Sequence, residues 1–242
     1  MKRYIQDVWK QFCLMRDLLL AGVLFLGGLY VVGMVIVVVL MSGTEEDSVF
    51  LMGSLMVVGA LFYMCFFSAA QMVTNYNYAI AMGQTRRQTL PAYMTATWIV
   101  YLVFDLAVVL LHWIEQRFLA VIYPGIVQED VAQPILRWQY LLLIALVGMA
   151  VTMLMGAAIT RFGRTAYHVF WVVMLVIVIG LPRGFTYLKQ YQSGSALTIA
   201  LQQMTAYVGA HAQLVLTSGG VIGSVICIIA ACLMLRRQQV SI

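Results

Sequence analysis

The side chains most able to do chemistry in this chain are three ionisable groups within one apolar stretch: Asp105, His112 and Glu115. His112 follows Asp105 by seven residues, which places the two on the same face of a helix. Glu115 follows His112 by three residues, and we expect it to face the outer interface. An ionisable group at the centre of a bilayer costs about 2.5–3.5 kcal/mol on insertion scales, so Asp105 is a functional candidate by default.

Three interpretations of Asp105 stay open. It is protonated or hydrogen-bonded to a neighbouring segment, or it lines a translocation cavity with His112, or it carries protons in an ion-coupled transporter. One aspartate does not make an intramembrane aspartyl protease, which needs a pair. His112 and Glu115 have no third ligand in view, so we expect no metal site. No Ser-His-Asp or Cys-His arrangement can be argued from the sequence, and we expect no catalytic residue in this chain.

The composition indicates the solvent in which these residues lie. Apolar residues make up 63% of the 242-residue chain and charged residues only 10%, whereas soluble domains carry roughly 25% charged residues. Such a chain cannot cover a globular surface with polar groups. A crossing helix needs about 20 apolar residues. We therefore predict one all-α, polytopic transmembrane domain over residues 1–242, with six spans at about 18–41, 49–70, 92–114, 140–160, 167–181 and 212–235.

The distribution of Lys and Arg predicts the orientation. With both termini in the cytoplasm, 10 of the 14 basic residues fall on the inner side. The net charge of +5 follows from this bias and does not argue for nucleic acid. Before the first span, Tyr4, Ile5, Val8, Trp9 and Phe12 recur at helical spacing, with Lys10 and Gln11 off the stripe. Residues 1–17 are therefore expected to form an amphipathic helix in the cytoplasmic interface.

A polar interruption over residues 71–91 separates the second and third spans. It is cytoplasmic by the charge rule. Gly83 is a suitable end for one helix, and Thr85 is a suitable N-cap for the next. Arg86 and Arg87 would then lie in a first helical turn, where basic residues oppose the helix dipole. With Pro91 before the next span, we expect a helix through Tyr76–Met82, then a break, a short polar helix and re-entry into the membrane.

The segment AIAMGQTRRQTL, residues 79–90, resembles the first cytoplasmic loop of permease subunits of bacterial ATP-binding-cassette (ABC) exporters of the type-2 class. That loop commonly reads like alsmGvsRkxf, and Leu90 departs from its usual aromatic. The resemblance extends over the whole chain in architecture but over about twelve residues in motif. It assigns the contact with the ATPase to Ala79, Met82, Gly83, Gln84, Thr85, Arg86 and Arg87.

The resemblance implies an export permease in a bacterial cytoplasmic membrane. The loop would be a coupling helix seated on a separate cytoplasmic ATPase, present in two copies, beside a second identical or homologous permease chain. ATP and Mg would bind the ATPase, since this chain contains no Gly-x-x-x-x-Gly-Lys-Ser/Thr phosphate loop. The expected substrate is amphipathic: a bacteriocin-like peptide, a lipid or a drug. The alternatives are a peptide-immunity or sensor protein without transport, and an ion-coupled carrier that uses Asp105.

Small residues spaced by four predict close helix packing. The fourth span carries Gly148, Thr152, Gly156 and Thr160, and the sixth carries Gly219 with Gly223 and Gly220 with Ser224. Packing within the chain and a seam between two permease chains both explain this pattern. The outer loop 183–211 contains an apolar stretch at 196–207 that is too short to span, and the family resemblance favours a re-entrant helix there over an ordinary surface helix.

Overall fold

The computed structural model describes residues 2–43, 48–50, 53–81, 85–123, 127–129, 136–176, 180, 183 and 211–236. Within these ranges the chain is almost entirely helical. The elements are α1 (Lys2–Leu14), α2 (Arg16–Gly43), β1 (Ser48–Phe50), α3 (Gly53–Ala81), α4 (Arg86–Ile122), β2 (Val127–Glu129), α5 (Trp138–Phe162), α6 (Arg164–Leu175) and α9 (Ala212–Arg236).

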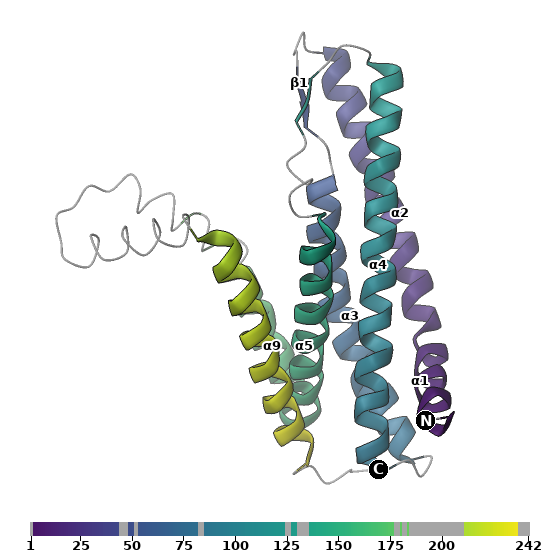
Figure 1. The fold of residues 1–242 in the computed structure, drawn as a ribbon, viewed down its shortest axis with the longest axis vertical. Coiled ribbons are helices and arrows are strands. Elements are labelled where there is room, and N and C mark those ends of the chain that lie inside the picture. Colours follow the sequence, from purple (N-terminus) through teal and green to yellow (C-terminus); the bar gives the residue numbers. More distant parts are fainter. Residues whose placement is uncertain are drawn as a thin grey trace, which may run out of the picture.

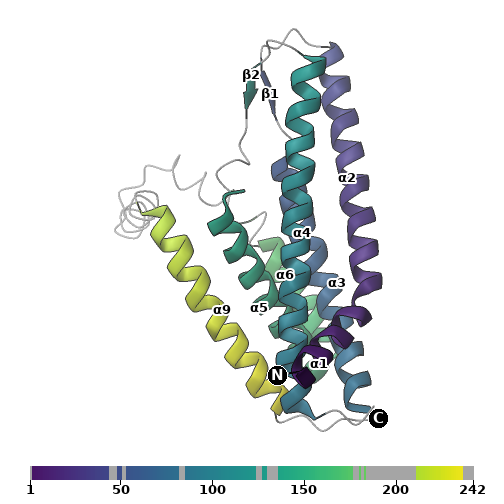
Figure 2. The same cartoon turned by 45° about the vertical axis from the view of Figure 1, so that its right-hand side comes forward.

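The long helices form an elongated bundle in which α2, α3, α4 and α5 run side by side (Figure 1). Helix α9 packs mainly on α5 and leans away from the other helices (Figure 1). Helix α1 crosses the base of α4 (Figure 2). The α3–α4 junction and the last turn of α9 lie at this same end, whereas β1 and β2 lie at the opposite end.

Four helices in the described ranges, α2, α4, α5 and α9, are long and apolar enough to cross a membrane. Their outward faces expose large apolar side chains: Leu24 is 76% exposed and Ile226 60%. Water would penalise such a surface at about 25 cal/mol per Å², whereas lipid does not. The chain is therefore a multi-pass membrane protein. Six spans, and a cytoplasmic location for both termini, stay predictions.

The fifth predicted span, 167–181, is described only in part: helix α6 covers its first residues and begins slightly earlier, at Arg164. Beyond Val176 the structure describes Gly180 and Arg183, and the rest of this stretch lies outside the described residues. The predicted re-entrant segment at 196–207 also lies outside them, as does loop 183–211 apart from Arg183 and His211.

Within the predicted loop 71–91, the expected helix around Tyr76 is present as the last turns of α3. Helix α3 continues to Ala81 and α4 begins at Arg86, so only 82–85 separate them. The expected short polar helix does not form a separate element, because α4 runs straight through Pro91. A proline this close to a helix start loses one backbone hydrogen bond. Just beyond it Ala92, Tyr93 and Ala96 are buried, and their packing favours the continuous helix.

The outer end of α4 also differs from the prediction. The third span was expected to end at Ile114, with an outer loop from Glu115 to Gln139, but α4 continues to Ile122. Its 37 residues rise about 55 Å, so one end projects beyond a hydrocarbon core. Past this end, β2 pairs in parallel with β1, with Val49 opposite Gln128.

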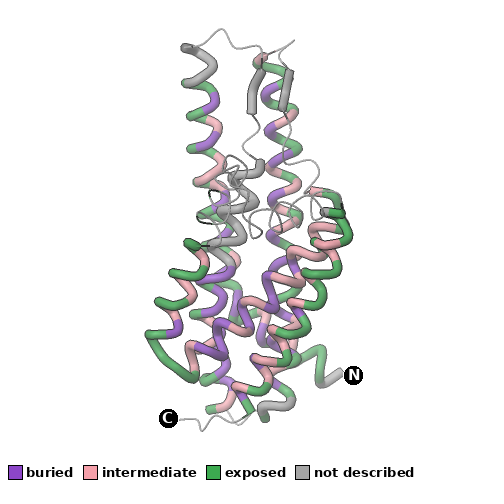
Figure 3. Tube along the Cα trace, turned by 90° about the vertical axis from the view of Figure 1, so that its left-hand side faces the viewer, coloured by how far each residue is buried: buried purple, intermediate pink, exposed green. Residues whose placement is uncertain are grey.

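The core lies where α3, α4 and α5 meet, and buried positions are densest in the half of the bundle nearest α1 (Figure 3). The stripe of small residues on α5 faces this core. A Cβ atom at Gly148 would overlap the ring of Tyr101 on α4, and one at Gly156 would overlap the side chain of Met72 on α3. Between them, Thr152 is fully buried. These small residues let α5 approach both helices closely.

On α9 the two columns of small residues have different surroundings. Gly220 faces α5, where an added Cβ would come within 2.9 Å of Leu143, and Ser224 is buried. At Gly219 and Gly223 an added Cβ would meet nothing within 4 Å. The Gly220–Ser224 column therefore makes the α5 contact, and the Gly219–Gly223 column faces away from the described chain.

Gly148→Ala is expected to destabilise the protein by about 1–3 kcal/mol, because the new methyl group collides with the buried Tyr101 ring. Gly219→Ala is the matched control: it gains helix propensity of up to about 1 kcal/mol and meets open space. Reversible unfolding in mixed micelles, followed by circular dichroism, measures both changes. Equal unfolding free energies for the two variants would contradict the packing described here.

Candidate functional site

The α3–α4 junction is the first part of the candidate site. Thr85 has an extended backbone, with φ −78° and ψ 144°, and occupies the N-cap position of α4. Its carbonyl accepts hydrogen bonds from the backbone N–H groups of Gln88 and Thr89 and from the Thr89 hydroxyl at 3.1 Å. The predicted helix start after Thr85 is confirmed. The predicted side-chain cap is not made.

The seven predicted coupling residues do not share one environment. Ala79 is only 4% exposed, because α3 remains helical to its end and turns Ala79 inward with Met72 and Tyr76. It packs inside the protein instead of facing a partner. Thr85 is exposed, and Arg86 and Arg87 are the first two residues of α4. The other three predicted residues, Met82, Gly83 and Gln84, lie outside the described residues.

Helix α1 is tied to α4 one turn above this junction. The Tyr4 hydroxyl donates to the Pro91 carbonyl at 3.3 Å and lies 2.7 Å from the Thr95 hydroxyl. The Thr95 hydroxyl donates to the same carbonyl at 3.0 Å. Nothing in the sequence indicated this contact, because Tyr4 is far from Pro91 and Thr95 along the chain. The Pro91 carbonyl therefore accepts from two side-chain hydroxyls, one of them from α1.

The predicted apolar stripe of α1 is divided between two surroundings. Val8 and Phe12 pack against the core, whereas Ile5 and Trp9 are 60% and 64% exposed. Their exposure suits a helix that contacts both the bundle and the interfacial lipid.

Buried amide side chains lie close to α1 and were missed from the sequence. Gln11, expected off the stripe, is 1% exposed, because the face of α1 that carries it packs on the bundle. Gln71 on α3 donates through Nε2 to the Leu14 carbonyl at 3.5 Å. Within the described part of the chain, the Gln11 Oε1, Gln71 Oε1 and Asn75 Nδ2 atoms have no hydrogen-bond partner. Amides inside an apolar helix such as α3 were the available signal.

The ionisable residues of α4 fall into two separate places. His112 Nδ1 lies 3.7 Å from Glu115 Oε2, with the two side chains 7% and 0% exposed, and His112 Nε2 lies 3.3 Å from Gln116 Nε2. Glu115 therefore does not face the outer interface. Because α4 remains helical to Ile122, it turns Glu115 into the bundle beside His112.

Asp105 stands apart from this pair, since seven helical residues separate it from His112 by about 10 Å along the axis. It is half-buried, and its Oδ2 atom has no hydrogen-bond partner among the described residues. No group of three His, Cys, Asp or Glu residues in the described ranges could hold a metal ion.

One buried polar contact joins the three core helices. The Tyr101 hydroxyl of α4 lies 2.8 Å from the Thr152 hydroxyl of α5, and it donates to Cys65 Sγ of α3 at 3.8 Å. Tyr101 is 1% exposed. The sequence marked Thr152 as a packing residue but did not identify its partner.

A scan against protein-family models and searches of curated proteins and solved structures find no match for this chain. The resemblance to ABC permeases therefore enters only as a proposal.

Tyr4→Phe is expected to loosen α1, because it removes a hydroxyl that contacts both Pro91 and Thr95. A lost hydrogen bond of about 1 kcal/mol corresponds to roughly fivefold faster exchange of α1 amides. Tyr78→Phe is the matched control, since Tyr78 lies at the same end of the bundle and is 56% exposed. Hydrogen–deuterium exchange in micelles reads the outcome. Equal α1 exchange in Tyr4→Phe and Tyr78→Phe would show that the Tyr4 contact does not hold the helix.

Proposed function

We propose that this chain is the permease subunit of a bacterial ABC transporter and that it exports an amphipathic substrate across the cytoplasmic membrane. ATP, with Mg, is hydrolysed on a separate cytoplasmic ATPase present in two copies, beside a second permease chain. The observation that carries the proposal is the exposed start of α4. There a four-residue junction presents Thr85 and leads directly into two arginines.

The position of these arginines favours an acidic partner. Arg86 and Arg87 are the first two residues of α4, and its first turn contains no acidic residue. Cations at a helix N-terminus oppose the helix dipole by a few tenths of a kcal/mol each. The positive-inside rule explains basic residues on this side of a membrane but not their position at a helix start. A carboxylate-bearing surface on an ATPase would offset the unfavourable charge.

The continuity of α4 supports mechanical coupling. A transport cycle driven from outside the membrane needs a stiff element between motor and spans. Helix α4 runs unbroken from Arg86 to Ile122, and its buried residues Tyr93, Val100 and Tyr101 belong to the main core. A displacement at Arg86 would therefore reach the centre of the bundle. The contact of Tyr4 with Pro91 and Thr95 would make α1 move with it.

In this proposal the ATPase contacts fewer residues than the seven that the sequence motif assigns to it. Ala79 is buried and supports the junction from inside. Met82, Gly83, Gln84, Thr85, Arg86 and Arg87 would face the ATPase. Asp105 and His112 are proposed to lie along the substrate path. The proposed substrate is an amphipathic peptide, lipid or drug.

An ion-coupled carrier is the second candidate, and Asp105 is the reason. A carboxyl oxygen without a partner inside an apolar helix is costly, and proton or cation binding would relieve that cost. The immunity or sensor alternative shares the ATPase contact but involves no transport.

Reversing the charge of the junction tests the leading proposal. With a candidate bacterial ABC ATPase co-expressed, Arg86→Glu/Arg87→Glu is expected to lower permease-stimulated ATP hydrolysis in nanodiscs at least tenfold, because carboxylates would repel the acidic surface. Arg161→Glu/Arg164→Glu is the matched control, because its exposed arginines belong to α5 and α6 and flank the turn at Gly163. Equal loss in both variants, or no ATPase bound to the wild type, would contradict the proposal.

Asp105→Asn separates the exporter from the carrier. Asparagine keeps the shape of aspartic acid but cannot release or bind a proton. We expect ATP-driven uptake into inverted vesicles to change less than threefold in this variant, and uptake driven by a proton gradient alone to be absent even in the wild type. Gradient-driven uptake that Asp105→Asn abolishes would establish the carrier instead.

A further inference from the structure

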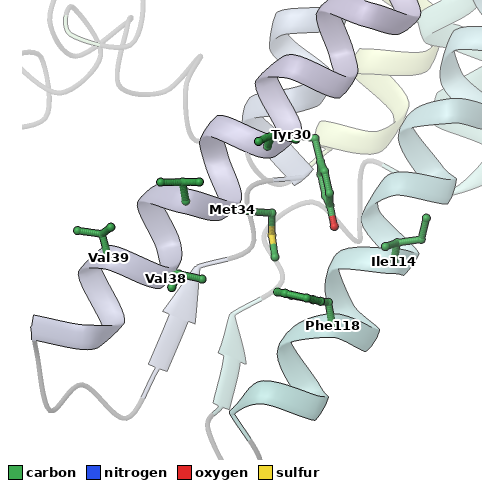
Figure 4. Close-up of a pocket in the computed structure, with 8 residues that line it drawn as sticks. Tyr30, Met34, Val38, Val39, Ile114 and Phe118 are labelled. Atoms are coloured by element: carbon green, nitrogen blue, oxygen red, sulfur yellow. The ribbon is translucent and has the colours of Figure 1, made fainter.

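A groove of about 470 Å³ runs between α2 and α4 near the end that carries β1 and β2 (Figure 4). Its walls are apolar: Tyr30, Met34, Val35 and Val38 come from α2, and Ile114 and Phe118 come from α4. The side chains of Tyr30, Met34 and Phe118 extend into the space between the two helices (Figure 4). The groove opens on the lipid-facing surface, where Val35 is 56% exposed and Phe118 44%.

The length of the groove matches one leaflet. Its α2 wall extends from Tyr30 to Val39, which is about 13 Å at 1.5 Å per residue. Half of a hydrocarbon core is about 15 Å thick. An acyl chain lying along the helices would therefore fill the groove from the membrane centre to the interface.

A cation flanks this groove on α4. Arg117 is exposed, and it is the third residue after Ile114, so it lies next to this lining residue on the surface of α4. Its guanidinium carbon lies 5.5 Å from the centre of the Trp113 ring, which is itself 55% exposed. A tryptophan under an arginine is typical of the membrane interface. The guanidinium group suits the bidentate binding of a phosphate.

The charge that is accessible beside the groove distinguishes an amphiphile with an anionic head group from one with a cationic head group. Glu115 also lies near the groove, but its side chain is 0% exposed and is engaged with His112. A cationic head group could not reach it without rearrangement of the bundle. Among the described residues of α2 and α4 at this end, Arg117 is the accessible charged side chain beside the groove.

We propose that a phospholipid binds here, with one acyl chain in the groove between α2 and α4 and its phosphate on Arg117. The site belongs to the leaflet on the side of β1 and β2. This proposal does not depend on whether the chain is a permease.

Native mass spectrometry of the full chain in detergent, titrated with phosphatidylglycerol, tests the head-group contact. The wild type is expected to retain one lipid. Arg117→Gln should bind about tenfold more weakly, because a charged hydrogen bond is lost. Arg137→Gln, which changes the exposed arginine at the N-cap of α5, is the matched control and should bind like the wild type.

A second pair of variants tests the acyl-chain site without changing charge. Val35→Trp fills the groove and should lower lipid binding by a similar factor. Val172 on α6 is 59% exposed, and Val172→Trp should leave lipid binding unchanged. Glycerol phosphate, which has the head-group chemistry without acyl chains, should not compete with the lipid at equal concentration.

Three results would overturn the proposal. The first is equal lipid binding by the wild type, Arg117→Gln and Val35→Trp. The second is competition by glycerol phosphate, which would indicate a phosphate site without an acyl chain. The third is preferential retention of dodecyltrimethylammonium that Glu115→Gln abolishes, which would assign the groove to a cationic amphiphile.

Discussion

The packing of Tyr101 is the contact on which the rest of the bundle depends. Its ring occupies the space left by Gly148, and its hydroxyl lies at hydrogen-bond distance from Thr152. Lipid tails are as apolar as a leucine side chain, so helices in a membrane gain nothing from hiding apolar surface from water. They associate through close packing and through polar contacts instead. Tyr101 supplies both and brings α3, α4 and α5 together at one level.

The two ends of α4, on either side of Tyr101, differ in how closely they pack on neighbouring helices. Towards Arg86 the helix is packed on α1 and α3, and Tyr4 hydrogen-bonds its first turns. Towards Ile122 it separates from α2 sufficiently to leave the groove lined by Tyr30 and Phe118. The bundle is therefore tight where an ATPase contact is proposed and open to lipid at the far end. Because α4 is one continuous helix, the two ends are mechanically connected.

Polar groups inside the bundle are paired along α4 where the chain provides a partner. His112 and Glu115 form one pair, and Tyr101 with Thr152 forms another. Asp105 Oδ2, Gln11 Oε1 and Asn75 Nδ2 have no such partner in the described ranges. Unsatisfied polar atoms are expensive in an apolar medium. A change of conformation, an ion or a substrate that supplied partners to these atoms would therefore stabilise the protein.

The sequence by itself determined that this is a multi-pass membrane protein of long apolar helices, because lipid demands such helices and composition records that demand directly. It also located the start of α4 after Thr85, although the side-chain cap that suggested this start is not made. Only the tertiary structure decided that α4 passes through Pro91 and continues to Ile122, that Glu115 and Gln11 turn inward, and that Gly220 packs on α5 while Gly219 does not. Those outcomes depend on contacts between residues far apart in the chain. Helical periodicity specifies a face, but it does not specify which neighbour covers that face.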